Sequence, residues 1–292
     1  MPKAKKEAVA KPQRPDVIEF SLYGGKITGK FFEGSHQYWI NGKRKTGVTT
    51  YIGIMDKSRP LMIWATGLCR DALLGLIDAK QTIDQDAIVK ASNLYDEKKD
   101  EAASIGTEVH NWIEAYIKGE NPGMPDTKEA QIGVNAFLDW VSANKVKFLS
   151  SERVVYSKKH DFIGKMDIEA RVNGKLALID IKTSNDLYNT YRMQTAAYVK
   201  ADEEESGRQY KERWLLRVAK ETEKDYIKRM TEKNDMRERL GKTPQEIKDY
   251  QVFEALNLDK EPENMDYDYQ GFLHAKGLFE WNKKTDFFTN GK

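Results

Sequence analysis

The chain of 292 residues lacks the features that mark several classes of protein. Its one cysteine, Cys69, excludes disulfides within the chain and leaves no set of thiols for a zinc or iron–sulfur site. No apolar run approaches the roughly 20 residues that a membrane-spanning helix needs. The first fifteen residues are basic but lack the apolar segment of a secretory signal. We therefore expect a cytoplasmic protein in a reducing compartment, with no membrane partner.

A large charge of one sign is also missing. The chain has 48 basic and 46 acidic residues, a formal net charge of +2, which excludes a strongly acidic DNA mimic. A nucleic-acid partner would need a local basic groove, since the global charge gives no strong attraction. No G-x-x-x-x-G-K-[ST] loop occurs, so any nucleotide-driven unwinding would require a separate protein.

The order of the hydrophobic patterns predicts one α/β domain with a mixed central sheet flanked by helices. An Asn41-Gly42 turn between apolar runs predicts an N-terminal β-hairpin. The expected strands are 27–33, 36–40, 47–53, 151–157, 161–172, 175–183 and 213–219. The expected helices are 58–79, a stretch from 84 to 118 with a break near Gly106, 127–144 and 189–201.

The same patterns divide the chain into regions. Residues 1–15 read as a flexible basic tail, and 16–292 as a single domain. Within it, we expect N-terminal strands and helices at 16–145, a core at 146–220, a charged helical insertion at 220–250 and a closing helix within 251–292. A capping box from Thr243 to Glu246 predicts the last helix of the insertion. Four residues of the closing helix are expected to be buried: Phe272, Leu273, Leu278 and Trp281.

The main functional signal is a pair of strands joined by an Asn173-Gly174 turn. Side chains alternate along a strand, so Asp180 and Lys182 share one side of it. Asp167 lies on the other arm and can face Asp180 across the hairpin. Two carboxylates suit Mg²⁺, and a nearby lysine could orient or deprotonate a water and offset charge on a phosphate. The alternative is that Asp180 and Lys182 simply pair with each other.

Two helices add polar pairs spaced four residues apart, and so on one face of each helix. His110 pairs with Glu114, and an imidazole is a good ligand for manganese. Gln194 pairs with Tyr198 and could brace the lysine strand or touch a nucleic-acid backbone. Trp112 and Tyr116 could stack bases, although helical periodicity also fits a place in the core.

Taken in order, His110, Gly164-x-x-Asp167, Asp180-x-Lys182 and Gln194-x-x-x-Tyr198 resemble the PD-(D/E)xK nuclease superfamily, RecB-like branch. The flanks are similar to phage exonucleases and the mitochondrial genome maintenance exonuclease. The resemblance implies a restriction-endonuclease-like core that uses Mg²⁺ or Mn²⁺. It implies metal ligation by His110, Asp167, Asp180 and the Ile181 carbonyl, a catalytic Lys182, and supporting roles for Glu152, Gln194 and Tyr198. Met166 departs from the proline of the superfamily name, and the four cysteines of the iron–sulfur relatives are absent.

The function that this resemblance implies is that of a metal-dependent DNA exonuclease in recombination, repair or replication. A protein of this kind could be encoded by a phage and act in the cytoplasm of the host. DNA ends, single- or double-stranded, would be its substrate, and a single-strand annealing or binding protein is a candidate partner. Two alternatives stay open: a structure-specific or restriction-like endonuclease, and a non-catalytic DNA-binding relative. Strand polarity and oligomeric state are not specified by the sequence.

Overall fold

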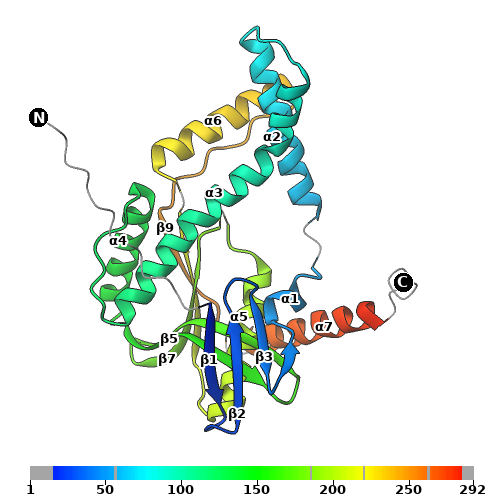
Figure 1. The fold of residues 1–292 in the computed structure, drawn as a ribbon. Coiled ribbons are helices and arrows are strands. Elements are labelled where there is room, and N and C mark those ends of the chain that lie inside the picture. The colour runs from blue at the N-terminus through cyan, green and yellow to red at the C-terminus, as the bar shows by residue number, and fades with distance from the viewer. Residues whose placement is uncertain (1–15, 56–57, 185, 220, 262–263, 285–292) are drawn as a thin grey trace, which may run out of the picture.

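The computed structural model describes residues 16–55, 58–184, 186–219, 221–261 and 264–284, so the expected basic tail lies outside the described residues. Two sheets and seven helices make up this part of the chain (Figure 1). The N-terminal sheet contains β1 (Val17–Leu22), β2 (Ile27–Phe32), β3 (Gln37–Ile40) and β4 (Lys43–Lys45). The central sheet contains β5 (Lys147–Ser157), β6 (Phe162–Val172), β7 (Lys175–Lys182), β8 (Glu212–Val218) and β9 (Phe253–Asn257). The helices are α1 (Val48–Ile52), α2 (Ser58–Asp78), α3 (Gln85–Ile117), α4 (Lys128–Ala143), α5 (Asn189–Ser206), α6 (Glu223–Arg239) and α7 (Asn264–Lys284).

The central sheet is mixed and has helices on both faces, which confirms the expected α/β class. Its strand order is β5-β6-β7-β8-β9, with β7 and β8 parallel and the other neighbours antiparallel. On one face, α3 and α4 bury Val109 and Phe137 against Ile179 of β7. On the other face, α1, α5 and α7 bury apolar side chains against Leu178 of β7. β7 is therefore apolar on both sides, as a central strand must be, until Asp180 and Lys182 end it.

The N-terminal sheet packs against the outer part of the central one. Asn41 and Gly42 both have positive φ, of 48° and 74°, at the tight turn between β3 and β4, which confirms the predicted hairpin. Phe31 and Tyr38 of this sheet form a cluster with Tyr156 and Ile163 of β5 and β6. The small sheet is thereby fixed beside the turn end of the β5–β6 hairpin.

Several sequence-based expectations were wrong. The expected strand at 47–53 is instead the short helix α1 at 48–52, because Val48, Tyr51 and Ile52 share one helical face that is buried in the cluster with α5 and α7. No break occurs near Gly106, since α3 is one continuous helix that begins at the side-chain cap Asp84.

Errors also occur in other parts of the chain. Residues 243–246 form no helix, and the strands β1, β4 and β9 were not predicted. In α7, Phe272 is buried and Leu273 is partly buried, but Leu278 and Trp281 are 52% and 61% exposed. The core contact of α7 continues as far as Phe279, whose ring meets Tyr51, but Leu278 and Trp281 point away from it.

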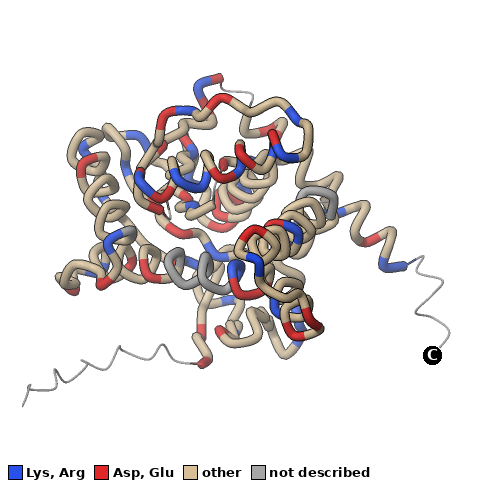
Figure 2. The backbone as a smooth tube through the Cα atoms, turned by 90° about the horizontal axis from the view of Figure 1, so that it is seen from above, with Lys and Arg blue, Asp and Glu red and all other residues tan. Residues whose placement is uncertain are grey.

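An extension made of α2, the N-terminal half of α3 and α6 lies beyond the central sheet (Figure 1). An ion pair of 2.6 Å between Arg239 and Asp78 links α6 to α2. α6 buries no residue, in agreement with the charged helical insertion expected there. Figure 2 shows basic and acidic residues interspersed along the chain, α6 included. Among the described residues, no helix combines the length and the apolar character that crossing a membrane requires.

Candidate metal centre

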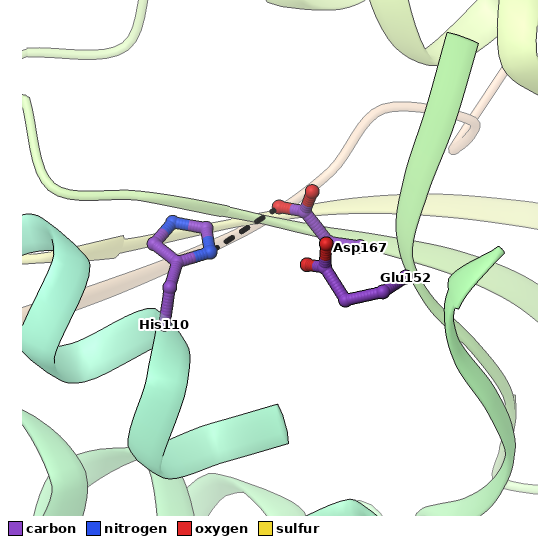
Figure 3. A group of neighbouring side chains, drawn as sticks. All are labelled: His110, Glu152 and Asp167. Atoms are coloured by element: carbon purple, nitrogen blue, oxygen red, sulfur yellow. Dashed lines mark ion pairs between the residues drawn. The ribbon is translucent and has the colours of Figure 1, made fainter. Parts of the chain in front are cut away.

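Three side chains from distant parts of the sequence meet at the middle of β5 and β6, near the point where β7 ends. His110 comes from α3, Glu152 from β5 and Asp167 from β6, and their nearest ligand atoms all lie within 4.8 Å of one another. Figure 3 shows the three side chains converging from the helix and the two strands. His110 Nδ1 lies 4.0 Å from Asp167 Oδ2. All three residues are partly exposed, so a small ligand can reach them from solvent.

Asp167 sits where β6 and β7 separate. The pairing of these strands ends at Ile168 and Ile179, and Asp167 is the next residue of β6. Its Oδ2 accepts a hydrogen bond of 2.9 Å from the backbone N–H of Ile181, in place of the regular sheet bonding. The neighbouring strand thus fixes the orientation of the carboxylate, while a small cleft lined by Ile181, Glu114 and Ser151 gives access to it.

Glu152 reaches the cluster through an unusual backbone conformation. Its φ of 53° is in the left-handed region, which costs a non-glycine residue about 1–3 kcal/mol. An irregular residue in a strand redirects its side chain, and such residues concentrate near functional sites. Burial raises the pKa of Glu152, the Lys165 ammonium opposes that shift and the Asp167 carboxylate adds to it.

Lys165 is the counter-ion of this carboxylate. It makes a close ion pair with Glu152, lies 3.6 Å from Glu33, and has its ammonium 5.0 Å from the ring centre of Phe31. Neither Lys165 nor Glu33 was predicted from the sequence as a residue of the site. Alternation along β6 could have found Lys165, because it lies two residues before Asp167 and on the same side of the strand.

Asp180 and Lys182 lie next to this cluster but do not belong to it. Their side chains form an ion pair of 2.5 Å, as the alternative interpretation of the sequence predicted. Asp180 is fully buried. Burial raises the pKa of Asp180 to about 6, an effect that Lys182 counteracts and Asp167 reinforces. Lys182 pairs with Oδ2 of Asp180, whereas the other oxygen, Oδ1, accepts no hydrogen bond from the described residues. A buried carboxylate with an unused oxygen is costly, and a bound cation would lower that cost.

Lys182 is held as an ammonium. Burial by itself would lower its pKa, but the carboxylates of Asp180 and Asp167 outweigh burial and raise the pKa above the ordinary lysine value. The ammonium also lies 4.8 Å from the ring centre of Tyr191, a contact that the sequence analysis did not anticipate. These contacts favour a role as a fixed positive charge over that of a proton acceptor.

Gln194 and Tyr198 form the predicted pair on α5. Gln194 Nε2 donates a buried hydrogen bond of 3.0 Å to Tyr198 Oη. The Tyr198 ring packs directly on Gly164, where any Cβ would collide with it. Gly164 is therefore required for the close approach of α5 to β6, and the Gln194–Tyr198 pair braces the strand that carries Asp167.

The two aromatic candidates on α3 lie on the core side of the helix. Trp112 is buried and donates a hydrogen bond of 2.7 Å from Nε1 to the carbonyl of Gly123. Tyr116 is more exposed and stacks on Trp112 with ring centres 5.3 Å apart. The prediction that Trp112 lies in the core is confirmed, and its buried ring is not accessible to a nucleic-acid base.

The residues present fit a divalent cation. Carboxylate oxygens suit Mg²⁺, and an imidazole added to carboxylates suits Mn²⁺. Two neighbouring carboxylates, Glu152 and Asp167, repel each other unless a cation lies between them. The structure brings together His110, Asp167 and Glu152, whereas the predicted set was His110, Asp167, Asp180 and the Ile181 carbonyl. Glu152 therefore moves from a supporting residue to a candidate ligand, and the roles of Asp180 and Ile181 stay predictions.

A comparison with protein-family models gives no match for this chain, and a comparison with curated proteins gives none either. The chemistry of the site must therefore be argued from its own residues.

Proposed function

We propose that this protein is a metal-dependent nuclease that hydrolyses phosphodiester bonds in DNA, and that it acts as an exonuclease. The observation that carries the proposal is the convergence of His110, Glu152 and Asp167 beside the Asp180–Lys182 pair. A mixed sheet that presents carboxylates of β5 and β6 beside the carboxylate and lysine at the end of β7 also fits a restriction-endonuclease-like core. The ordered motifs that resemble RecB-like nucleases support the same assignment.

Each residue of the site would have a separate role in such a reaction. His110, Glu152 and Asp167 would hold Mg²⁺ or Mn²⁺, with Asp180 adjacent as a further carboxylate. A bound divalent cation would supply Lewis-acid activation of water and neutralise phosphate charge. Ile181 and Lys165 keep Asp167 and Glu152 in place. Lys182 places a fixed positive charge where negative charge grows on the phosphate in the transition state.

The decisive experiment follows end-labelled linear DNA and closed-circular DNA, each single- and double-stranded, in Mg²⁺ or Mn²⁺. We expect linear DNA to be shortened from its ends and closed circles to survive. Cleavage of closed circles would favour the endonuclease alternative. DNA binding without cleavage in either metal would favour the non-catalytic one.

Variants tie the activity to the site. We expect His110→Asn and Glu152→Gln to remove activity while folding normally, because both side chains are partly exposed. Lys182→Ala should also be inactive, but it leaves the buried Asp180 without its counter-ion, so thermal unfolding must be measured beside it. Lys242→Ala, at an exposed position after α6, is the matched lysine control. Full activity in the His110 and Glu152 variants would refute the site.

A further inference from the structure

Two tyrosine rings follow Lys182 in a chain of contacts. Tyr191 lies under the Lys182 ammonium, and Tyr188 contacts Tyr191 edge to face, with ring centres 5.6 Å apart. Tyr188 is 48% exposed, so much of its ring is open to solvent. The exposed Tyr188 ring is therefore separated from the Lys182 ammonium by Tyr191 alone. It is placed to stack on the base of a nucleotide whose phosphate lies near that ammonium.

Tyr188 also marks the N-terminus of α5, an 18-residue helix. Among the described residues no side chain caps this end: Tyr188 makes no capping hydrogen bond, and Asp186 instead accepts a bond of 2.8 Å from the neighbouring N–H of Leu187. The N–H of Tyr191 already donates a bond of 2.9 Å to the Tyr188 carbonyl, which leaves those of Asn189 and Thr190 as the first N–H groups of α5 without a backbone partner among the described residues. The helix dipole attracts negative charge at such an end. A helix end of this kind binds phosphate groups readily.

Thr190 is an independent sign of a ligand at the same place. It is 7% exposed, and its hydroxyl is buried with no hydrogen-bond partner among the described residues. It lies in the first turn of α5, where side chains tilt toward the N-terminus of the helix. A buried hydroxyl normally has a partner, so this one is available to an oxygen-rich ligand.

We propose that Tyr188 and the first turn of α5 form a subsite for the nucleotide next to the scissile phosphate. The backbone N–H groups and the Thr190 hydroxyl bind its phosphate, and its base stacks on the Tyr188 ring. This inference rests on the nuclease function proposed above and specifies its substrate. Inside a duplex, both faces of a base are covered by its neighbours, and only the outer face of the terminal pair is open. The subsite therefore selects DNA strands whose bases near the cleaved end are unpaired.

The test measures binding separately from cleavage. A fluorescein-labelled oligothymidylate and a blunt duplex are titrated with protein in Ca²⁺, and fluorescence anisotropy reports affinity. Tyr188→Ala should weaken binding of the single strand by roughly 5- to 100-fold, the range for one stacked base. Tyr188→Phe should bind like the wild type, since the ring is kept. Tyr267→Ala, at a 79% exposed tyrosine on α7, is the matched control and should have no effect.

Two further arms assign the contacts. With an abasic strand, wild type and Tyr188→Ala should bind equally, because no base remains to stack. Thr190→Val should weaken binding of the base-containing and the abasic strand alike, since it removes a phosphate contact. Equal single-strand affinity of wild type and Tyr188→Ala would overturn the subsite, as would an equal loss with the abasic strand.

The outcome is distinguishable from failure of the nuclease proposal. If the wild type cleaves DNA and Tyr188→Ala binds single strands normally, only the subsite is wrong. If the wild type cleaves no DNA in Mg²⁺ or Mn²⁺, the nuclease proposal fails first, and the substrate inference falls with it.

Discussion

The backbone N–H of Ile181 donates a hydrogen bond of 2.9 Å to Oδ2 of Asp167, across the point where β6 and β7 separate. Asp167 thus has a structural role, as the acceptor of this hydrogen bond, and a proposed chemical role, as a metal ligand. Two substitutions separate these roles. Asp167→Asn keeps an acceptor for Ile181, so its free energy of unfolding should stay within about 0.5 kcal/mol of the wild type. Asp167→Ala leaves that N–H without a partner and should cost about 1–3 kcal/mol. Both should abolish nuclease activity, and equal stability of the two variants would contradict this account.

Binding of a divalent cation should stabilise the folded protein. A ligand that binds only the native state adds about 2.7 kcal/mol at a free concentration of about 100 times its Kd. We expect Mn²⁺ to raise the melting temperature of the wild type by several degrees and to leave that of His110→Ala almost unchanged. His274→Ala, an exposed histidine on α7, is the control and should respond to Mn²⁺ like the wild type. A full Mn²⁺ response in His110→Ala would exclude His110 as a ligand.

The positive φ of Glu152 should lower the free energy of unfolding of the protein. Glycine adopts φ near 53° without strain, whereas alanine does not. Glu152→Gly and Glu152→Ala both lose the ion pair with Lys165 and the candidate ligand, so both should be inactive. Chemical denaturation should show Glu152→Gly to be more stable than Glu152→Ala by about 1 kcal/mol. The same stability in both would mean that the backbone is unstrained.

Much of this site could be predicted from local patterns, and the errors have identifiable causes. Alternation along β7 correctly placed Asp180 and Lys182 on one side, because a regular strand has a fixed period of two. The same rule failed to assign Glu152 to the metal centre, because the left-handed backbone at that residue breaks the regular geometry and is invisible in the sequence.

Long-range packing explains the remaining differences. Residues 47–53 contain Val48, Thr49 and Thr50, which favour strands locally, but burial of one face against α5 and α7 selects the helix α1. The pairing of Asp180 with Lys182 instead of with the His110 cluster depends on how α3 and α5 cover opposite faces of the sheet. Hydrophobic periodicity gives the face of each residue but not the helix that covers it.

Glu204 should make folding stability depend on acid pH. Burial alone would raise its pKa, but hydrogen bonds from the Ser157 hydroxyl and from the backbone N–H groups of Lys159 and Lys158 outweigh burial and lower it below 4.5. A carboxylate with a depressed pKa stabilises the fold above the unfolded value and loses that contribution as pH falls through the folded value. We therefore expect the wild type to lose stability relative to Glu204→Gln as pH is lowered below about 4.5. Parallel pH profiles of unfolding for the two proteins would contradict this prediction.

The contact between Gly164 and Tyr198 should tolerate substitution less well than most contacts in the core. A Cβ at Gly164 would overlap the Tyr198 ring, and neither partner can move easily, since both α5 and β6 are buried there. Gly164→Ala should cost about 1–3 kcal/mol in the free energy of unfolding, the range for overpacking a core. By shifting Tyr198 away from Gln194, it should also lower nuclease activity. Gly75→Ala, at a helix position of α2 with open space around it, is the matched control and should be neutral or stabilising by about 0.5–1 kcal/mol. A Gly164→Ala variant as stable and active as Gly75→Ala would show that α5 does not brace the strand carrying Asp167.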